Sequence, residues 1–304
     1  IESEKESLRK KFDALPGRGQ STALSFLHQN DIVSTAVLNS TATRLFTGTR
    51  TGMLYFWDTV KGEYTKSERC DSSAVTALTV SKDDRLIAFA NNAGSVCIFD
   101  SNGNRIGAPI TAHLKRVNAV DFSSDGKLLL SGSEDMTVKL WEISSGRILG
   151  TVHRTNSVSA VAISENGKYI MLGDAAKQAL WFGRDDNGVL KQLCALSKHA
   201  GYISFLQMSD DSKRALVGTQ GGGLYEWSLN ATEQCELSKK QPKTNNKNTG
   251  KASSPDEVRD VTDFLGDFYT LGIDGKGVTR IWKTSTGSPS RTLANPRPQQ
   301  AEKN

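Results

Sequence analysis

The chain has 304 residues, of which 37% are apolar and 23% are charged, and its formal net charge is +5. Frequent glycine (27 residues) with scarce proline (7 residues) excludes a collagen-like chain, and the composition is typical of a soluble globular protein. The mild positive charge permits an acidic partner or RNA but requires neither. No apolar run reaches about 18 residues, so we expect no membrane insertion.

Residues 1–19 are predicted to form an amphipathic helix and a linker. Leu8, Phe12 and Leu15 lie at helical spacing before Pro16 and Gly17, which end the pattern. We expect this helix to pack on the following domain or to link it to an upstream one, with binding of a partner as the alternative. The chain begins with Ile, so we expect it to be part of a longer multidomain or multi-subunit protein.

Residues 20–293 contain a short strand that recurs and ends in an aromatic residue. The aromatic positions are 57, 99, 141, 181, 227 and 282, and all five tryptophans occupy one of them. A period of about 40–45 residues with four short strands per repeat is that of a propeller blade. Apolar residues alternate within the strands, and the turns are rich in Asp, Asn, Gly and Ser. The sequence therefore predicts an all-β domain.

The segment from Val117 to Gly150 resembles the WD40 repeat. It contains Phe122–Lys127, Ser131–Asp135 and Val138–Glu142 in the order and spacing of that family. The resemblance extends over about residues 22–293 and is weaker outside the central unit. It implies a WD40-type β-propeller with six recognisable four-stranded blades, and six or seven in total.

The repeat divides the domain into six sequence units. We expect a disordered loop at residues 239–256 and a disordered tail at residues 294–304, because both are polar and lack periodicity. The predicted units are residues 22–58, 64–100, 106–142, 147–181, 190–227 and 233–282.

The resemblance also implies a buried hydrogen-bonded tetrad in the third unit, made of His113, Ser131, Asp135 and Trp141. These polar groups need one another to avoid burial without partners. The other three histidines occupy the corresponding place in their units. The fourth and fifth units keep a histidine and a tryptophan but lose the aspartate. The second and sixth units lose most of the tetrad, with Phe99 in place of a tryptophan, so we expect those blades to be held by apolar packing and to be less rigid.

No motif predicts chemistry at a bound metal or cofactor. The four cysteines have no close spacing, which argues against a zinc site, and Cys97 is typical of a small core residue. We therefore expect reduced cysteines and an intracellular location, cytoplasmic or nuclear. Gly221–Gly223 precedes a strand rather than a helix, unlike a phosphate-binding loop. We predict no catalytic residue, no cofactor and no metal site, with an enzyme that uses the central channel as a less favoured alternative.

The predicted function is a non-catalytic protein–protein interaction scaffold or sensor, with an RNA- or ribosome-associated subunit as the alternative. In the WD40 family, partners dock most often on the face where each first strand begins, so the resemblance implies protein or peptide partners there. Tyr202 and Arg116 are the expected anchors, because tyrosine and arginine dominate interface hot spots. The residues expected on this face are Asp31, Arg50, Asn92, Lys115, Arg116, Glu134, Asn156, Asp174, Tyr202, Gln220, Arg259 and Asp274.

Overall fold

The chain forms only antiparallel β-sheet in the part that the computed structural model describes. That part comprises residues 32–241 and the strands between residues 257 and 292. These residues form 24 strands in six four-stranded sheets, and the strands of each sheet follow chain order. Short gaps in the first range fall at residues 42, 59–60, 62, 186–187, 198, 200 and 221–222.

The first five sheets are named blades 1 to 5. Blade 1 comprises β1 (Val33–Leu38), β2 (Arg44–Thr49), β3 (Met53–Asp58) and β4 (Glu63–Arg69). Blade 2 comprises β5 (Val75–Val80), β6 (Leu86–Asn91), β7 (Ser95–Asp100) and β8 (Arg105–Thr111). Blade 3 comprises β9 (Val117–Phe122), β10 (Leu128–Ser133), β11 (Thr137–Glu142) and β12 (Arg147–His153).

Two further blades and a sixth sheet follow. Blade 4 comprises β13 (Val158–Ile163), β14 (Tyr169–Asp174), β15 (Ala179–Arg184) and β16 (Leu190–Leu196). Blade 5 comprises β17 (Ile203–Met208), β18 (Arg214–Thr219), β19 (Leu224–Leu229) and β20 (Cys235–Gln241). The sixth sheet comprises β21 (Glu257–Phe264), β22 (Asp267–Ile273), β23 (Thr279–Lys283) and β24 (Ser288–Thr292).

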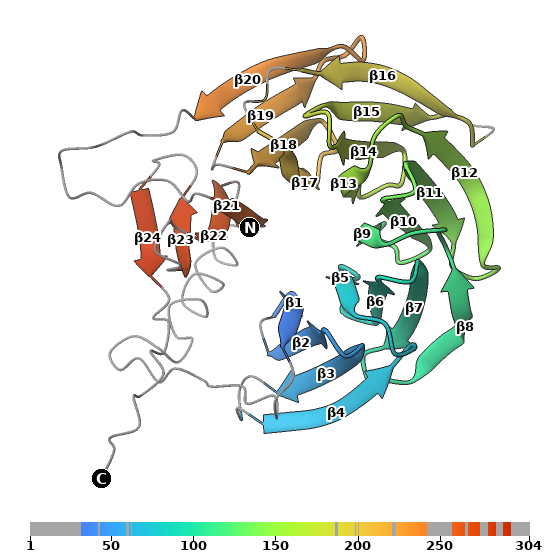
Figure 1. Cartoon of the computed structure of the whole chain (residues 1–304). Coiled ribbons are helices and arrows are strands. Elements are labelled where there is room, and N and C mark those ends of the chain that lie inside the picture. The colour runs from blue at the N-terminus through green and yellow to red at the C-terminus, as the bar shows by residue number, and fades with distance from the viewer. Residues whose placement is uncertain are drawn as a thin grey trace. The chain divides into compact units, whose positions relative to one another are not determined.

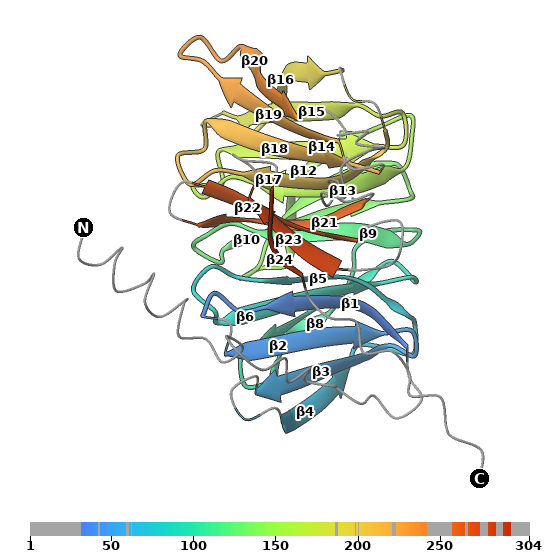
Figure 2. The same cartoon turned by 90° about the vertical axis from the view of Figure 1, so that its left-hand side faces the viewer.

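The five blades lie within one compact unit, His28–Lys243. Their first strands are neighbours on the inner side of the unit, and their fourth strands lie on the outer side (Figure 1). Seen from the side, the blades stack in order from β1–β4 to β17–β20 (Figure 2). The sixth sheet belongs to a second unit and has the same strand order. The predicted fold of four-stranded propeller blades is confirmed, and the total of six or seven blades stays a prediction.

The blades are offset from the predicted sequence units. Blade 3 spans residues 117–153, whereas the predicted unit spans residues 106–142. In the units that begin at residues 64, 106, 147, 190 and 233, the opening strand pairs with the third strand of the preceding blade, as β8 pairs with β7. The units that begin at residues 64, 106, 147 and 190 therefore each contain the connection between two consecutive blades.

Several predicted segments fall outside the described residues. These are the helix of residues 1–19, the outer strand of residues 22–27 and the tail of residues 294–304. The predicted loop of residues 239–256 begins too early, because β20 continues to Gln241 through its pairing with β19. The rest of that loop also lies outside the description.

In blades 1, 3 and 4, a glycine near the end of the second strand (Gly48, Gly132 and Gly173) allows the next blade to approach closely. A Cβ atom on Gly132 in β10 would lie 2.6 Å from Val161 Cγ1 and 2.7 Å from Val158 Cγ1, both in β13. A Cβ atom on Gly173 in β14 would lie 2.4 Å from Ile203 Cγ2 in β17. The absent side chain thus sets the distance between the second strand of one blade and the first strand of the next.

The prediction that all five tryptophans share one position is wrong for two of them. Trp141 in β11 pairs with Leu129, the second residue of β10. In blade 4 the corresponding partner, Ile170, pairs with Phe182 instead, and Trp181 is shifted by one residue. In the sixth sheet the shift recurs, because Lys283 follows Trp282 and takes the aligned place. A shift of one residue hardly changes a repeat spacing of about 40 residues, but in the sheet it moves the side chain to the opposite face.

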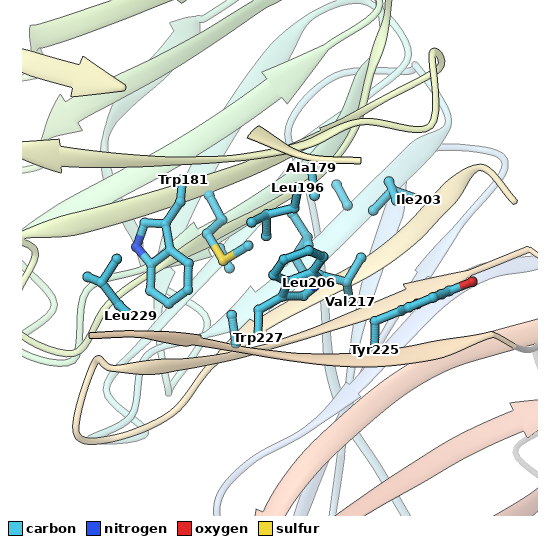
Figure 3. Close-up of a cluster of buried hydrophobic side chains, with 13 residues drawn as sticks. Ala179, Trp181, Leu196, Ile203, Leu206, Val217, Tyr225, Trp227 and Leu229 are labelled. Carbon is cyan, nitrogen blue, oxygen red and sulfur yellow. The ribbon is translucent and has the colours of Figure 1, made fainter. Parts of the chain in front are cut away.

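The shift turns Trp181 toward the other side of its blade, because neighbouring residues of a strand face opposite sides. Trp141 packs toward blade 2, with Ala77 and Ala88. Trp181 packs toward blade 5, where it joins Trp227 and Leu229 in a buried cluster (Figure 3). The contact between blades 4 and 5 therefore contains two tryptophans.

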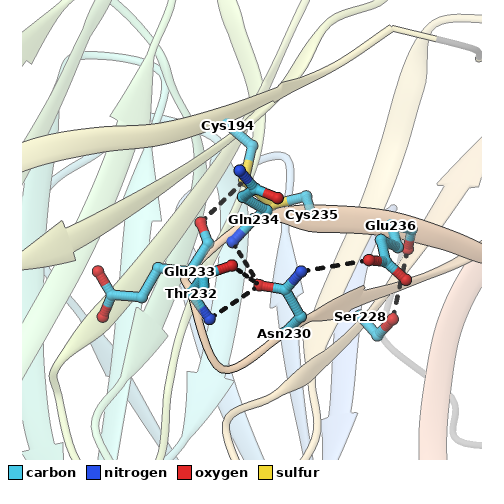
Figure 4. Close-up of a disulfide and its surroundings, with 8 residues drawn as sticks. All are labelled: Cys194, Ser228, Asn230, Thr232, Glu233, Gln234, Cys235 and Glu236. Carbon is cyan, nitrogen blue, oxygen red and sulfur yellow. Dashed lines mark hydrogen bonds between the residues drawn. A yellow bond between two sulfur atoms is a disulfide. The ribbon is translucent and has the colours of Figure 1, made fainter.

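The four cysteines form two disulfides, Cys70–Cys97 and Cys194–Cys235, which differs from the expected reduced state. Cys194 in β16 and Cys235 in β20 connect the fourth strands of blades 4 and 5 beside the Trp181 cluster (Figure 4). Cys97 is buried as expected, at 1% exposure. The paired cysteines are 27 and 41 residues apart, so only the packing of consecutive blades brings them together.

Replacing Gly132 by Ala is expected to destabilise the protein by roughly 1–3 kcal/mol, because the added methyl group overlaps two packed valines. Denaturant unfolding followed by tryptophan fluorescence measures the loss. Gly183→Ala is the matched control, since a Cβ atom there meets only the Leu193 side chain, at 3.3 Å. Equal losses in the two variants would contradict the role assigned to close packing.

Candidate interaction face

All five blades collect two sets of connections on one face, named here the loop face. In a four-stranded antiparallel sheet the first strand begins at the end where the second strand turns into the third. The opposite face, named the hairpin face, carries the turns between first and second strands and between third and fourth strands. The described connections of the loop face lie within residues 50–52, 70–74, 92–94, 112–116, 134–136, 154–157, 175–178, 197–202 and 220–223.

The structure brings the four tetrad residues of blade 3 together behind the loop face. Trp141 Nε1 donates to Ser131 Oγ at 2.9 Å, and Ser131 Oγ lies 2.8 Å from His113 Nε2. His113 Nδ1 lies 3.0 Å from Asp135 Oδ2. A neutral His113 that carries its proton on Nδ1 satisfies every member of this chain, from the indole through the hydroxyl and the imidazole to the carboxylate.

The electrostatics of the tetrad agree with this protonation state. Burial lowers the pKa of His113 below its ordinary value, although the negative charge of Asp135 acts in the opposite direction. For Asp135, burial alone would raise the pKa. Hydrogen bonds from Thr137, from the Leu114 N–H and from His113 outweigh burial, so the pKa of the carboxyl is lowered. The site thus holds a neutral imidazole against a carboxylate.

The tetrad also supports an exposed loop. The Leu114 N–H donates to Asp135 Oδ2 at 3.1 Å, so the buried carboxylate holds the backbone of residues 112–116. Ser133 Oγ donates to the carbonyl oxygens of Lys115 (3.2 Å) and Arg116 (2.8 Å). The Leu114 side chain projects from this backbone and is 91% exposed. A buried network therefore presents a fixed surface loop.

The other blades keep only parts of the tetrad. In blade 5, Trp227 Nε1 donates directly to His199 Nε2 at 3.3 Å. In blade 1, Trp57 Nε1 donates to Thr47 Oγ1 at 3.0 Å, and His28 lies outside the described residues. In blade 4, His153 is exposed and Trp181 faces the opposite side of the sheet. The histidine and the tryptophan that this unit keeps are therefore not brought together in blade 4.

Most of the residues expected on the loop face are exposed there. Asn156 is half-buried. Asp174 is a correction: its side chain is buried and pairs with Arg154 Nη2 at 3.0 Å, so it offers no free surface. Arg259 lies in β21, and Asp31 and Asp274 lie outside the described residues. The exposed residues are Arg50, Asn92, Lys115, Arg116, Glu134, Tyr202 and Gln220.

Sequence reasoning missed the apolar side chains on the loop face. Leu114, Met136 and Ile32 are exposed at 91%, 40% and 57%. Leu114 carries a signal in the sequence, because it stands between the buried His113 and two cations, where a loop residue is usually polar. Met136 has a positive φ of 67° in its turn, which the sequence does not reveal.

On the hairpin face, one lysine connects turns of three blades. Lys82 Nζ, from the turn after β5, lies 2.8 Å from Glu165 Oε1 in the turn after β13. It also lies 2.9 Å from Asp210 Oδ1 in the turn after β17. Burial acts to lower the pKa of Lys82, but the bonds to both carboxylates outweigh it and raise the pKa. Blades 2, 4 and 5 thus share one ammonium group.

The described residues contain no group of three or more His, Cys, Asp or Glu side chains that could hold a metal ion. Within the same residues, no helix is long and apolar enough to cross a membrane.

Between blades 1 and 2, a cavity of about 260 Å³ is lined by residues that include Arg44, Trp57 and Lys66. The Arg44 guanidinium donates to the Ser101 carbonyl there, and Lys66 Nζ donates to the Gly103 carbonyl. Both cations therefore already donate hydrogen bonds to backbone oxygens of the chain.

His113→Ala is expected to destabilise the protein by about 2–4 kcal/mol, because it leaves a cavity and removes partners from Ser131 and Asp135. His153→Ala is the matched control. It removes an exposed histidine from the corresponding place of blade 4 and should cost less than about 0.5 kcal/mol. Thermal unfolding of both variants tests the difference, and a similar melting temperature for the two would rule out the structural role of the tetrad.

Comparisons with known proteins agree with this architecture. The family model described as "WD domain, G-beta repeat" matches residues 104–142. Autophagy-related protein 16 of Arabidopsis thaliana is 23% identical over 80% of the chain and 46% of its own length. Target of rapamycin complex subunit wat1 of Schizosaccharomyces pombe is 24% identical over 57% of the chain and 55% of its own length. The chain therefore spans about half the length of these relatives.

A solved structure gives the same fold. One chain in a crystal structure of the mitotic checkpoint complex superposes with a TM-score of 0.69 at 18% identity, over 86% of this chain and 77% of that one. At this identity the likeness concerns the fold alone. Repeated four-stranded blades, a tetrad of histidine, serine, aspartate and tryptophan, and the matching family model together identify the chain as a WD40-repeat protein with a β-propeller fold.

Proposed function

We propose that the protein is a non-catalytic protein–protein interaction module, and that it forms part of a longer multidomain or multi-subunit protein. The observation that carries this proposal is the loop face of blade 3, where a buried hydrogen-bond network holds Leu114, Lys115 and Arg116 in an exposed loop. Recognition residues on loops that a rigid scaffold positions are the usual way in which such domains bind partners.

One relative supports a role in an assembly, because wat1 is named as a subunit of the target of rapamycin complex. Tyr202 and Arg116 remain the proposed anchors. Both are exposed, Tyr202 at 50%, and they lie on the loop face of blades 5 and 3.

The double variant Tyr202→Ala, Arg116→Glu is expected to lose bound partner proteins by at least about tenfold, because anchors of this type each contribute about 1.4 kcal/mol or more. Affinity purification of the full chain with quantitative mass spectrometry measures the loss. The matched control is Val189→Ala, Lys127→Glu, which makes the same kinds of change at exposed positions of the hairpin face. Identical partner sets for the wild type and the loop-face variant would show that the face is wrongly chosen.

We also propose an intracellular location, in the cytoplasm or nucleus. Thiols are kept reduced in these compartments. Under those conditions the contact between blades 4 and 5 would depend on the packing of Trp181 and Trp227 rather than on the Cys194–Cys235 bond.

An intracellular location predicts that all 4 cysteines are free thiols in the living cell. Acid quenching of intact cells followed by alkylation and mass spectrometry counts the free thiols. The same protein after purification in air serves as the control, where both disulfides are expected to form. Disulfides already present in the quenched cells would contradict the proposed location.

A further inference from the structure

We infer that the loop face binds an acidic peptide segment that carries apolar side chains, with Leu114, Lys115 and Arg116 at the centre of the contact. This inference rests on the proposed function, which assigns the loop face to protein binding. It adds the chemistry of the partner, which neither the fold nor the relatives specify.

The loop face gathers exposed apolar side chains. Ile32, Leu114, Met136 and Tyr202 are exposed at 57%, 91%, 40% and 50%. Leu114 and Met136 lie close together, since the Leu114 N–H is bonded to Asp135, the residue before Met136. Leu114 is the most exposed large apolar side chain among the described residues, so it contributes little to the core. Leu114 and Met136 belong to one blade, whereas Ile32 and Tyr202 belong to blades 1 and 5, so the exposed apolar side chains are distributed over one face and mark it as a contact surface.

Three of these apolar groups, Leu114, Tyr202 and Ile32, lie beside a cation. Lys115 and Arg116 follow Leu114 in the same loop, and both are exposed. Lys177 Nζ lies 5.3 Å from the centre of the Tyr202 ring. The Arg50 N–H donates to the Ile32 carbonyl at 2.9 Å, which places these two residues side by side. The apolar positions and the positive charges therefore coincide.

The positive charges of the loop face are not balanced by neighbouring acids. Among the described residues, Arg50, Lys115, Arg116 and Lys177 form no ion pair with a carboxylate. Glu134 is the one exposed acid in the described connections of this face. Asp71 is half-buried and accepts hydrogen bonds from Asn91 and the Ser73 N–H, and the side chains of Asp135 and Asp174 are buried against His113 and Arg154. The face thus presents four exposed cations without an ion pair and one exposed carboxylate.

The hairpin face has the opposite character. Several of its cations have acidic partners within the chain: Lys82 with Glu165 and Asp210, Lys127 with Asp125, and Lys168 with Glu233, whereas the exposed Lys213 has none among the described residues. Since the two faces differ in charge pairing and not only in composition, the loop face is the surface that attracts an acidic partner. The cations of the loop face therefore favour binding of an acidic segment. The apolar side chains beside these cations favour leucine, isoleucine or phenylalanine within that segment.

The backbone under this surface is already fixed. Besides the bonds from Leu114 and Ser133, the Glu134 N–H donates to the Arg116 carbonyl at 2.9 Å. The Arg154 N–H donates to the Met136 carbonyl at 2.7 Å and connects the blade 3 turn to blade 4. A preorganised loop loses little conformational entropy on binding, which favours recognition of a short segment.

A peptide fits this surface better than RNA does. Single-stranded nucleic acid binds by stacking its bases on aromatic side chains along a basic groove. On the described loop face Tyr202 is the one exposed aromatic side chain, and the remaining anchors are aliphatic. Aliphatic side chains interleaved with cations match acidic peptides with apolar residues.

A random-peptide library displayed on phage tests the inference directly against the full chain. We expect the selected peptides to be enriched in Asp and Glu together with Leu, Ile or Phe. In fluorescence anisotropy, a selected peptide should lose at least about tenfold in affinity toward Lys115→Glu, Arg116→Glu and about fivefold or more toward Leu114→Ser. The matched control, Lys127→Glu, Lys213→Glu, has the same net charge as the first variant and should bind within about twofold of wild type.

Four outcomes would overturn the inference: no enriched peptides, enriched peptides without acidic residues, equal binding by the Lys115→Glu, Arg116→Glu variant, or binding of poly-uridylate in preference to the peptides. The proposed function is tested separately. If the Tyr202→Ala, Arg116→Glu variant loses its protein partners while selected peptides lack acids, the loop face still binds proteins and only the acidic chemistry is wrong.

Discussion

The structure depends on the contact between the second strand of one blade and the first strand of the next. A four-stranded sheet of this size cannot bury both of its faces alone, so each blade needs its neighbour. Gly132 and Gly173 make that contact close, because any side chain there would overlap Val158, Val161 or Ile203. The valines and isoleucines that begin the next blade then enter a continuous core of buried side chains.

The buried contacts of blade 3 determine what its surface can do. The tetrad lies behind the loop face, where Asp135 accepts the backbone N–H of Leu114 and so fixes an exposed loop. Ser133 connects the core to the surface, since it ends the buried strand β10 and its hydroxyl donates to the Lys115 and Arg116 carbonyl oxygens of the exposed loop. Blade 5 replaces this network with a single bond between Trp227 and His199. We expect a less rigid loop there.

Sequence periodicity predicted the blades well because spacing near 40 residues survives local variation. It could not detect a shift of one residue, so Trp181 was assigned to the place that Phe182 occupies. The Cys194–Cys235 pair was missed for a related reason: its proximity results from the packing of two blades and not from the spacing within one. Asp174 was assigned to the surface because its turn is polar, whereas the neighbouring Arg154 draws it into a buried pair. Lys115 and Arg116 are exposed on the loop face, and the absence of an ion pair at either residue became visible only in three dimensions.

The ammonium group of Lys82 has a consequence for how the domain responds to ionic strength. It holds together hairpins of blades 2, 4 and 5, which the backbone connects only through long stretches of chain. These groups are partly exposed, and dissolved ions weaken attraction between such charges. Added salt therefore acts on both faces. It screens the exposed cations of the loop face, and it weakens the ion pairs that Lys82 makes with Glu165 and Asp210 on the hairpin face. The salt dependence expected for the proposed binding at the loop face would therefore be accompanied by weakening of the Lys82 ion pairs on the hairpin face.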